Sequence, residues 1–417
     1  MTKSKDNTFI QVLHPVCCGL DVHKNKISAC LITIDEKGKE QFEIREFSAF
    51  TKNLIEMKEW LIKNDCPIVA MESTGVYWHP VFNVLEESTI GVLLVNARHV
   101  KNVPGRKTDI CDSKWLAGLL RHGLVNGSFI PPANVRVWRD LTRMRKTYTE
   151  SFADYKRRVH KLLTTANIKI DSVVSDLFGV TGRNLIDLLC SDDDLIIENI
   201  EKCLKGSLKK KTTELYDSLQ GFFKEHHKFQ LIGIMDTINI FEKRIVEINE
   251  KLDTLTEEYH GLIGRLDEIP GINKKSAQSI ISEVGITLNE FACIAAFTSW
   301  AGLCPGNNES AGKRKSGSNA VRNHTLKTIL VQVAWAAIKT KNSFYKAKYY
   351  KLKARRGAKK AIVAIAHKIA KAIYNIIKNG DSYRELGENY LTAQNQKKTL
   401  KNLRKKAEEM GFDLVAC

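Results

Sequence analysis

Residues 17–24 read Cys-Cys-Gly-Leu-Asp-Val-His-Lys, a short apolar run that ends on the carboxylate of Asp21. Apolar residues on both sides of Asp21 predict a strand that is buried on both faces. A carboxylate in such a place is costly unless a partner compensates its charge. A metal ion is the usual partner, so this stretch suggests that the strand ends at a metal site.

The first 125 residues alternate between strand and helix patterns. Strands are expected at 26–34, around 42–47, at 67–72 and at 91–96, and helices at about 54–64, after residue 72, and at 108–122. Glu72 ends the strand at 67–72, in the way that Asp21 ends its own strand. Asp109 and Asp112 open the last helix three residues apart, which places them on one helical face.

This order of elements is that of a ribonuclease H-like (RuvC-like) fold, in which acids on the first strand, the fourth strand and the last helix converge. The elements concerned carry four acids: Asp21, Glu72, Asp109 and Asp112. Carboxylates suit Mg²⁺ or Mn²⁺, and two such ions about 4 Å apart can clamp the attacking and leaving oxygens of a phosphodiester. Each aspartate alone would be a turn or cap residue; the joint placement predicts a metal site.

The positive charge is unevenly distributed along the 417 residues, a length that allows two or three domains. The chain has 65 Lys and Arg against 47 Asp and Glu, a net charge of +18. Residues 311–378 hold 18 of the basic groups and no acid, which leaves the rest of the chain balanced. A solvated basic face is the plain interpretation, but this concentration favours contact with a nucleic-acid backbone.

The ten cysteines form no CxxC pair and no Cys/His zinc spacing, and several lie in apolar segments where Cys acts as a small hydrophobe. The N-terminus lacks the apolar core of a signal peptide, and no uncharged apolar run is long enough to span a membrane. We therefore expect a soluble cytoplasmic protein with reduced cysteines and no membrane partner.

The middle of the chain, residues 131–263, follows the first domain (1–130) and predicts two long helices. Apolar residues step by three and four over 141–162 and again over 238–262. The pair predicts an antiparallel coiled coil, within one chain or between chains, with residues 168–228 as a small helical insertion at its tip. Basic residues between the apolar ones predict a basic outer surface on the first helix: Arg139, Arg143, Arg145, Lys146, Lys156, Arg157 and Arg158.

Residues 264–385 predict a mostly helical C-terminal domain, followed by a tail at 386–417. Residues 266–285 have the pattern of a helix–hairpin–helix, which presents backbone N–H groups to a phosphate. Isoleucines at 362–376 predict a buried helical stripe. The cations expected to contact nucleic acid are Lys274, Lys275, Lys313, Arg314, Lys315 and Arg322.

Ser310 lies in the Gly-rich polar loop at 303–317, just before three consecutive cations. A serine in such a loop is ordinarily a turn residue. The adjacent cations could hold a phosphate beside its hydroxyl, which would allow it to act as a nucleophile.

Six motifs together resemble the DEDD transposases of bacterial insertion sequences, the bridge-RNA-guided recombinases related to pilin-gene inverting recombinases. They are CGLDVHK (18–24), MESTGVYW (71–78), NARHVKNVPGRKTDICDSKWLAGLL (96–120), IPGINKKSAQSIISEVG (269–285), WAGLCPGNNESAGKRKSG (300–317) and GAKKAIVAIAHKIAKAIYNII (357–377). The resemblance covers both ends of the chain, and the middle shares only a helical pattern.

The resemblance implies an acidic tetrad at Asp21, Glu72, Asp109 and Asp112 and a nucleophilic serine at Ser310. The family's loop often reads SSGGKRR, whereas this loop has Glu309 and Ala311 at two of those positions. Ser316 and Ser318 are therefore alternative nucleophiles.

The resemblance also implies Mg²⁺-dependent DNA cleavage and strand exchange through a covalent protein–DNA intermediate. A bridge RNA would pair with donor and target DNA and so guide the enzyme. The working assembly would be a homo-oligomer, a dimer or a tetramer, associated with the bacterial nucleoid.

Two other classes of function fit the same residues. A metal-dependent Holliday-junction-type endonuclease would hydrolyse DNA with water and would not need Ser310. A nucleic-acid-binding protein without catalysis would use the acids structurally, although clustering four acids without a cation is costly.

Overall fold

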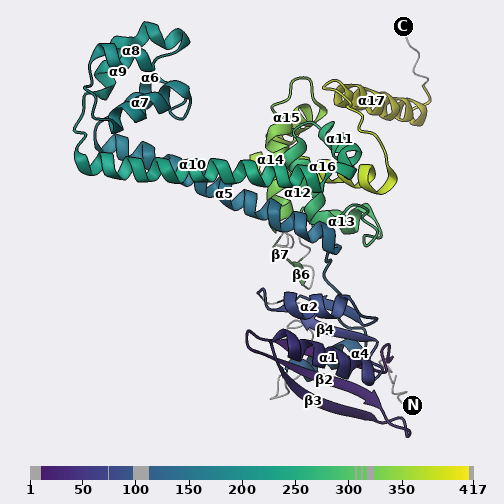
Figure 1. Cartoon of the computed structure of the whole chain (residues 1–417). Helices are drawn as coiled ribbons and strands as arrows, with labels where there is room; N and C mark the ends of the chain where they lie inside the picture. Colours follow the sequence, from purple (N-terminus) through teal and green to yellow (C-terminus); the bar gives the residue numbers. More distant parts are fainter. Residues whose placement is uncertain are drawn as a thin grey trace. The chain divides into compact units, whose positions relative to one another are not determined.

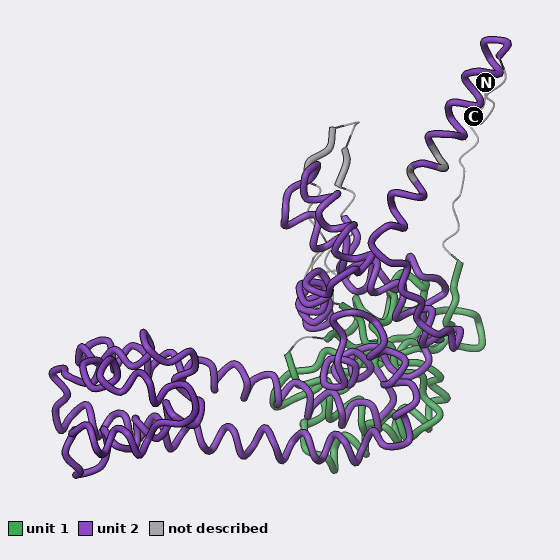
Figure 2. Tube along the Cα trace, turned by 90° about the horizontal axis from the view of Figure 1, so that it is seen from above, with its two compact units in different colours: residues 1–130 green, residues 131–417 purple. Residues whose placement is uncertain are grey.

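The computed structural model describes residues 11–73, 75–96, 112–305, 308–310, 313–316 and 324–412, with only the backbone of residues 308–310, 313–316, 324, 395, 397 and 398 (Figure 1). The chain divides into two compact units, Met1–Ile130 and Pro131–Cys417 (Figure 2). The finer division of the second unit at residues 263 and 385 stays a prediction.

Unit 1 is built on a five-stranded mixed sheet with the order β3-β2-β1-β4-β5 (Figure 1). The strands are β1 (Cys17–Val22), β2 (Lys26–Ile34), β3 (Glu40–Ser48), β4 (Ile68–Glu72) and β5 (Gly91–Val95), and the helices are α1 (Thr51–Lys63), α2 (Trp78–Glu86) and α4 (Asp112–Arg121). Strands β1, β2 and β3 pair antiparallel, whereas β1, β4 and β5 pair parallel. The expected α/β pattern of this unit is confirmed.

Two separate cores explain why β1 is apolar on both sides of Asp21. Cys18 and Leu20 are buried in one core with residues of α1 and α2. Cys17 is buried in the other core with Ala70 and residues of α4. Helices therefore cover both faces of the sheet, and the central strand is buried on each side, as the sequence predicts.

Gly19 allows α4 to lie directly against β1. A Cβ at this position would meet the carbonyl oxygen of Ser113 at 2.2 Å and the backbone nitrogen of Ala117 at 2.5 Å. Both atoms belong to the helix backbone, so neither can yield by changing a rotamer. The first turn of α4 can lie against β1 because residue 19 has no side chain.

Unit 2 is helical apart from a short hairpin among the residues that the structure describes. Its elements are α5 (Ala133–Thr165), α6 (Ile170–Val173), α7 (Val180–Cys190), α8 (Ile197–Cys203), η1 (Gly206–Lys211), α9 (Thr212–Leu219), α10 (Glu225–Leu255), η2 (Glu257–Tyr259), α11 (His260–Asp267), α12 (Lys274–Val284), α13 (Ile294–Trp300), β6 (Asn308–Ser310), β7 (Lys313–Ser316), α14 (His324–Ala337), α15 (Phe344–Arg356), α16 (Ala358–Asn379) and α17 (Tyr390–Glu409).

Helices α5 and α10 lie side by side and run in opposite directions (Figure 1). Arg145 of α5 donates to Asn249 of α10, and farther along α5 Tyr155 contacts Phe241. The residue number on α10 falls as the residue number on α5 rises, as it does in antiparallel helices. The second helix, expected over 238–262, begins and ends earlier than predicted, because α10 runs from Glu225 to Leu255 and residues 257–267 belong to η2 and α11.

The far end of the helix pair has its own core. Buried residues there come from the end of α5, the start of α10 and the small helices α6 to α9 between them, including Leu163, Leu185, Leu215 and Leu231. The helical insertion expected at the tip is present, and its apolar residues form a local core.

The C-terminal helices pack around α16. All five isoleucines of the predicted stripe are buried: Ile362, Ile365, Ile369, Ile373 and Ile376. Gly271, in the turn before α12, allows a close backbone approach like that at Gly19. A Cβ at residue 271 would lie 2.4 Å from the carbonyl oxygen of Val333 in α14. Among the described helices, none is long and apolar enough to cross a membrane.

We predict that Gly19→Ala destabilises unit 1 by roughly 3 kcal/mol, because the new methyl group overlaps two backbone atoms of α4. The free energy of unfolding, measured by denaturant titration, checks this value. Gly118→Ala is the matched control, since residue 118 lies in α4 and a Cβ there meets nothing within 4 Å. The control should be neutral or slightly stabilising, as Ala favours helix over Gly. Equal stability of the two variants would contradict the packing argument.

Candidate active site

Asp21 and Glu72 lie side by side where two parallel strands end. Strand β1 pairs with β4 so that Leu20 faces Met71. The next residues, Asp21 and Glu72, therefore stand at the same level on neighbouring strands. Side chains alternate along a strand, so both acids share the sheet face of Gly19 and Ala70, which is the face covered by α4.

The first turn of α4 lies over the same part of β1. Ser113 Oγ is 3.3 Å from Ser28 Oγ, and Ser28 is the cross-strand partner of Asp21. Asp112 precedes Ser113 and is exposed in the first turn of the helix. Three of the four predicted acids thus belong to elements that meet at one edge of the sheet. Sequence analysis missed the two buried serines that help to hold this arrangement, since neither belongs to a recognisable motif.

Asp21 is partly accessible and contacts a nearby histidine. Its side chain is 27% exposed, and its Oδ2 lies 3.0 Å from Nε2 of His23. Asp109 lies outside the described residues. Within the described ranges, no three His, Cys, Asp or Glu side chains are grouped closely enough to hold a metal ion. The donor types at this edge nevertheless suit a hard cation, because carboxylate oxygens are the ligands that Mg²⁺ and Mn²⁺ prefer.

Three buried cysteines lie at the starts of β1 and β4. Burial raises the pKa of the Cys17 thiol to about 12 and that of Cys66 to about 11, and it raises the pKa of Cys18 as well. They pack as small apolar side chains, as the sequence predicts.

Ser310 is in a β-hairpin, where sequence analysis expected an irregular loop. It is the last residue of β6, and its cross-strand partner is Lys313 at the start of β7. Arg314 pairs with Glu309 in the same hairpin. The backbone register therefore puts a lysine directly opposite the candidate nucleophile. Ser316 ends β7, opposite Asn308.

The other cations predicted to contact nucleic acid have different surroundings. Lys274 pairs with Asp253, with 2.8 Å between Nζ and Oδ1. Lys275 is exposed at the start of α12. Arg322 and Ser318 lie outside the described residues.

Three arginines of α5 contact α12, and the expected basic outer surface is wrong at two of them, Arg139 and Arg145, whose side chains are largely buried, whereas Arg143 remains exposed. Arg145 is buried and donates to Gln278, Ser279 and the carbonyl oxygen of Lys275 as well as to Asn249. The spacing of apolar residues along a helix predicts which residues are buried. It does not predict which neighbouring helix supplies the hydrogen-bond acceptors for an arginine.

Glu283 of α12 is the acceptor for the other two arginines. Its carboxylate is 1% exposed and takes two hydrogen bonds from Arg143, at 2.8 and 3.0 Å. Arg139 donates to the Glu283 carbonyl oxygen at 2.8 Å, and burial lowers the pKa of its guanidinium to about 10. The cluster therefore joins α5 and α12 through a buried charge pair.

Comparison with known protein families gives two matches. A model of DEDD transposases of the IS110 type matches residues 18–168, which include Asp21, Glu72, Asp109 and Asp112. A model described as the transposase IS116/IS110/IS902 family matches residues 264–351, which include Ser310. The chain belongs to the IS110 family of DEDD transposases. It is therefore an enzyme that acts on DNA. No curated protein matches the chain.

Transposases of this type typically use divalent metal ions. The acidic edge of unit 1 lies inside the first matched segment and the Ser310 hairpin inside the second. The α5–α12 arginine cluster joins parts of both segments of the transposase.

We predict that Glu283→Gln lowers the free energy of unfolding of unit 2 by about 3 kcal/mol, because it leaves buried Arg139 without a full counter-charge. Denaturant titration gives the value. The control is Glu150→Gln, which removes an exposed pair with Lys146 and should cost less than about 1 kcal/mol. A loss no larger than the control's would mean that the buried pair contributes little.

Proposed function

We propose that the transposase cleaves and exchanges DNA strands at a ribonuclease H-like (RuvC-like) acidic site. The register that aligns Asp21 with Glu72 is the observation that carries this proposal. A meander of three antiparallel strands followed by two parallel ones, with helices on both faces, also supports the fold assignment.

The four acids would hold Mg²⁺ or Mn²⁺, and each contributes from a different position. Asp21 and Glu72 present neighbouring carboxylates, whose mutual repulsion favours a cation between them. Asp112 would complete the set from the start of α4, together with Asp109, which is three residues earlier in the sequence. When bound, the metal would stabilise charge on the oxygens of the scissile phosphodiester.

Ser310 would be the nucleophile. Its oxygen attacks the phosphorus, loses its proton, and forms a phosphodiester with one DNA end while the other end leaves as a hydroxyl. Attack by a hydroxyl of a second DNA strand then restores the serine and completes the exchange. Lys313 is the cross-strand partner of Ser310, and a basic residue at this register position supports the role because the reacting phosphate is an anion.

Nucleic-acid contacts would come mainly from unit 2. The turn between α11 and α12 resembles a helix–hairpin–helix, in which Asn273 caps α12 by accepting from the Ser276 backbone at 2.9 Å. The basic segment 311–378 would hold the backbones of DNA and of a bridge RNA that supplies sequence choice. We propose a homo-oligomer. Within each chain, α5 and α10 form the proposed coiled coil.

We predict that the wild type forms a covalent protein–DNA adduct in Mg²⁺, visible as a shifted band on a denaturing gel. The protein is produced alongside its native flanking DNA so that any guide RNA is present. Ser310→Ala should abolish the adduct, and Asp21→Ala should reduce it by at least about 10³-fold, the scale expected for losing an electrostatic catalytic group. EDTA should have the same effect as Asp21→Ala.

Ser316→Ala is the matched control, since it removes a hydroxyl from the same hairpin and should retain the adduct. DNA cut without an adduct, and still cut by Ser310→Ala, would contradict the serine mechanism and favour hydrolysis by water at a junction-type nuclease site. Unchanged cutting by Asp21→Ala would contradict the acidic site itself.

A further inference from the structure

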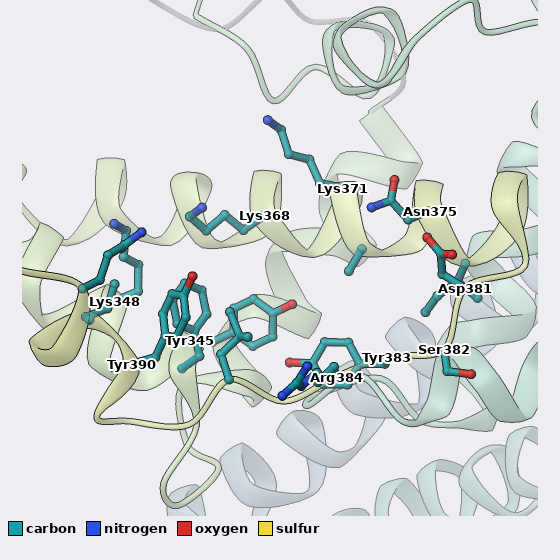
Figure 3. Close-up of a pocket in the computed structure, with 16 residues that line it drawn as sticks. Tyr345, Lys348, Lys368, Lys371, Asn375, Asp381, Ser382, Tyr383, Arg384 and Tyr390 are labelled. Atoms are coloured by element: carbon teal, nitrogen blue, oxygen red, sulfur yellow. The ribbon is translucent and has the colours of Figure 1, made fainter. Parts of the chain in front are cut away.

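A basic and aromatic pocket lies between α15, α16 and the segment that leads into α17 (Figure 3). Its volume is about 400 Å³, within the range of small-ligand sites. All its lining residues fall between 344 and 394, so it is contained in unit 2. It includes none of the candidate catalytic residues.

Positive charge gathers at this pocket. Lys348, Lys368 and Lys371 line it together with Arg384. Lys368 is half-buried, and burial, with the neighbouring charges of Lys348 and Lys371, lowers the pKa of its ammonium group. Charges of one sign that are partly withdrawn from water are stabilised by an anion, so the pocket favours a negatively charged ligand.

The acids near the pocket do not cancel this charge. Asp381 lines the opposite end from Lys348 and Lys368 (Figure 3). The carboxylate of Glu385 accepts from the backbone nitrogens of Phe344 and Gly387 and from the Tyr383 hydroxyl, at 2.8 to 2.9 Å. Glu385 therefore serves to hold the loop that forms one wall.

Aromatic rings stand beside the lysines. Tyr345 and Tyr383 stack with a centroid distance of 6.4 Å, and Phe344 meets the ring of Tyr390 edge-on at 5.8 Å. Tyr390 is 40% exposed, so part of its ring remains open. In Figure 3, Tyr390 lies at the same end of the pocket as Lys348 and Lys368. A planar group that carries an anion fits these two features together.

We propose that this pocket binds one unstacked nucleotide of a single-stranded nucleic acid, with its base on Tyr390 and its phosphate on Lys348 and Lys368. Stacking on an aromatic ring beside backbone-neutralising cations is how proteins commonly hold single strands. Asn375 and Ser382 at the other end supply polar groups for a base or sugar edge. An acidic peptide would use the cations but would leave the exposed tyrosine ring without a partner.

The site is independent of the acidic edge and of Ser310. Its lining residues include none of the candidate catalytic residues, so it would contribute to binding rather than to chemistry. Its loss should weaken nucleic-acid binding and leave the covalent chemistry of bound DNA intact.

The test is photocrosslinking of the full-length transposase to short single strands that carry 5-iodouracil, as DNA and as RNA of the same sequence. The crosslinked peptide is identified by mass spectrometry. A crosslink on Tyr390 or Tyr383 in either strand type supports the proposal and tells which nucleic acid supplies the nucleotide. Crosslinks confined to other parts of the chain overturn it.

Fluorescence anisotropy of the same strands measures how much the aromatic part and the basic part of the pocket each contribute to binding. Tyr390→Ala should weaken binding about tenfold, whereas Tyr390→Phe keeps the ring and should bind like wild type. Lys368→Gln should reduce the salt dependence of log K by roughly 0.7 for the lost phosphate contact. Lys401→Gln is the matched control, because Lys401 is exposed on α17, outside both the pocket and the basic segment 311–378.

Circular dichroism melting of each variant separates a binding loss from unfolding. Well-folded Tyr390→Ala and Lys368→Gln proteins that bind both strands like wild type would overturn the proposal. Protection of the pocket by adenosine monophosphate, without a crosslink to either strand, would also overturn the proposal. That result would indicate that the ligand is a free nucleotide.

Discussion

The close approach of α4 to β1 at Gly19 is the constraint on which the acidic edge depends. A Cβ on residue 19 would overlap the backbone of Ser113 and Ala117, so the helix can reach the strand only because that atom is absent. The same approach brings Ser113 to Ser28, the neighbour of Asp21, and sets Asp112 at the edge where Asp21 and Glu72 end their strands. Gly271 performs the corresponding task in unit 2, where it lets the turn before α12 lie on α14.

The positive charge of the transposase serves two purposes. Arginines of α5 are used inside unit 2, where Glu283 and the polar groups of α12 satisfy them and fix how the helices pack. A buried pair of this kind is costly to break rather than strongly stabilising to make. Lysines of α15 and α16 remain at a pocket with aromatic rings, where their charge is available to a ligand. Net charge alone, at +18, does not distinguish these uses.

The sequence predicted the central strand and the positions of Asp21 and Glu72 because burial on both faces leaves a continuous apolar run that ends on an acid. It failed at the Ser310 hairpin, where a Gly-rich polar segment has no alternation to reveal two strands. It also misassigned Arg139 and Arg145 to the outer surface, because a 3.6-residue period does not show which helix lies opposite. The pocket could not be predicted, since residues from 344 to 394 converge only through tertiary packing.

The central claim is that the edge formed by β1, β4 and the start of α4 holds the metal ion. Replacing Mg²⁺ with Fe²⁺ and adding ascorbate and peroxide generates hydroxyl radicals at the bound ion, which cut the nearby backbone. Mass spectrometry of the fragments then locates the site. We expect cuts near Asp21, Glu72 and Asp112 that disappear in Asp21→Asn. Cuts elsewhere, or cuts at this edge that persist in Asp21→Asn, would contradict it.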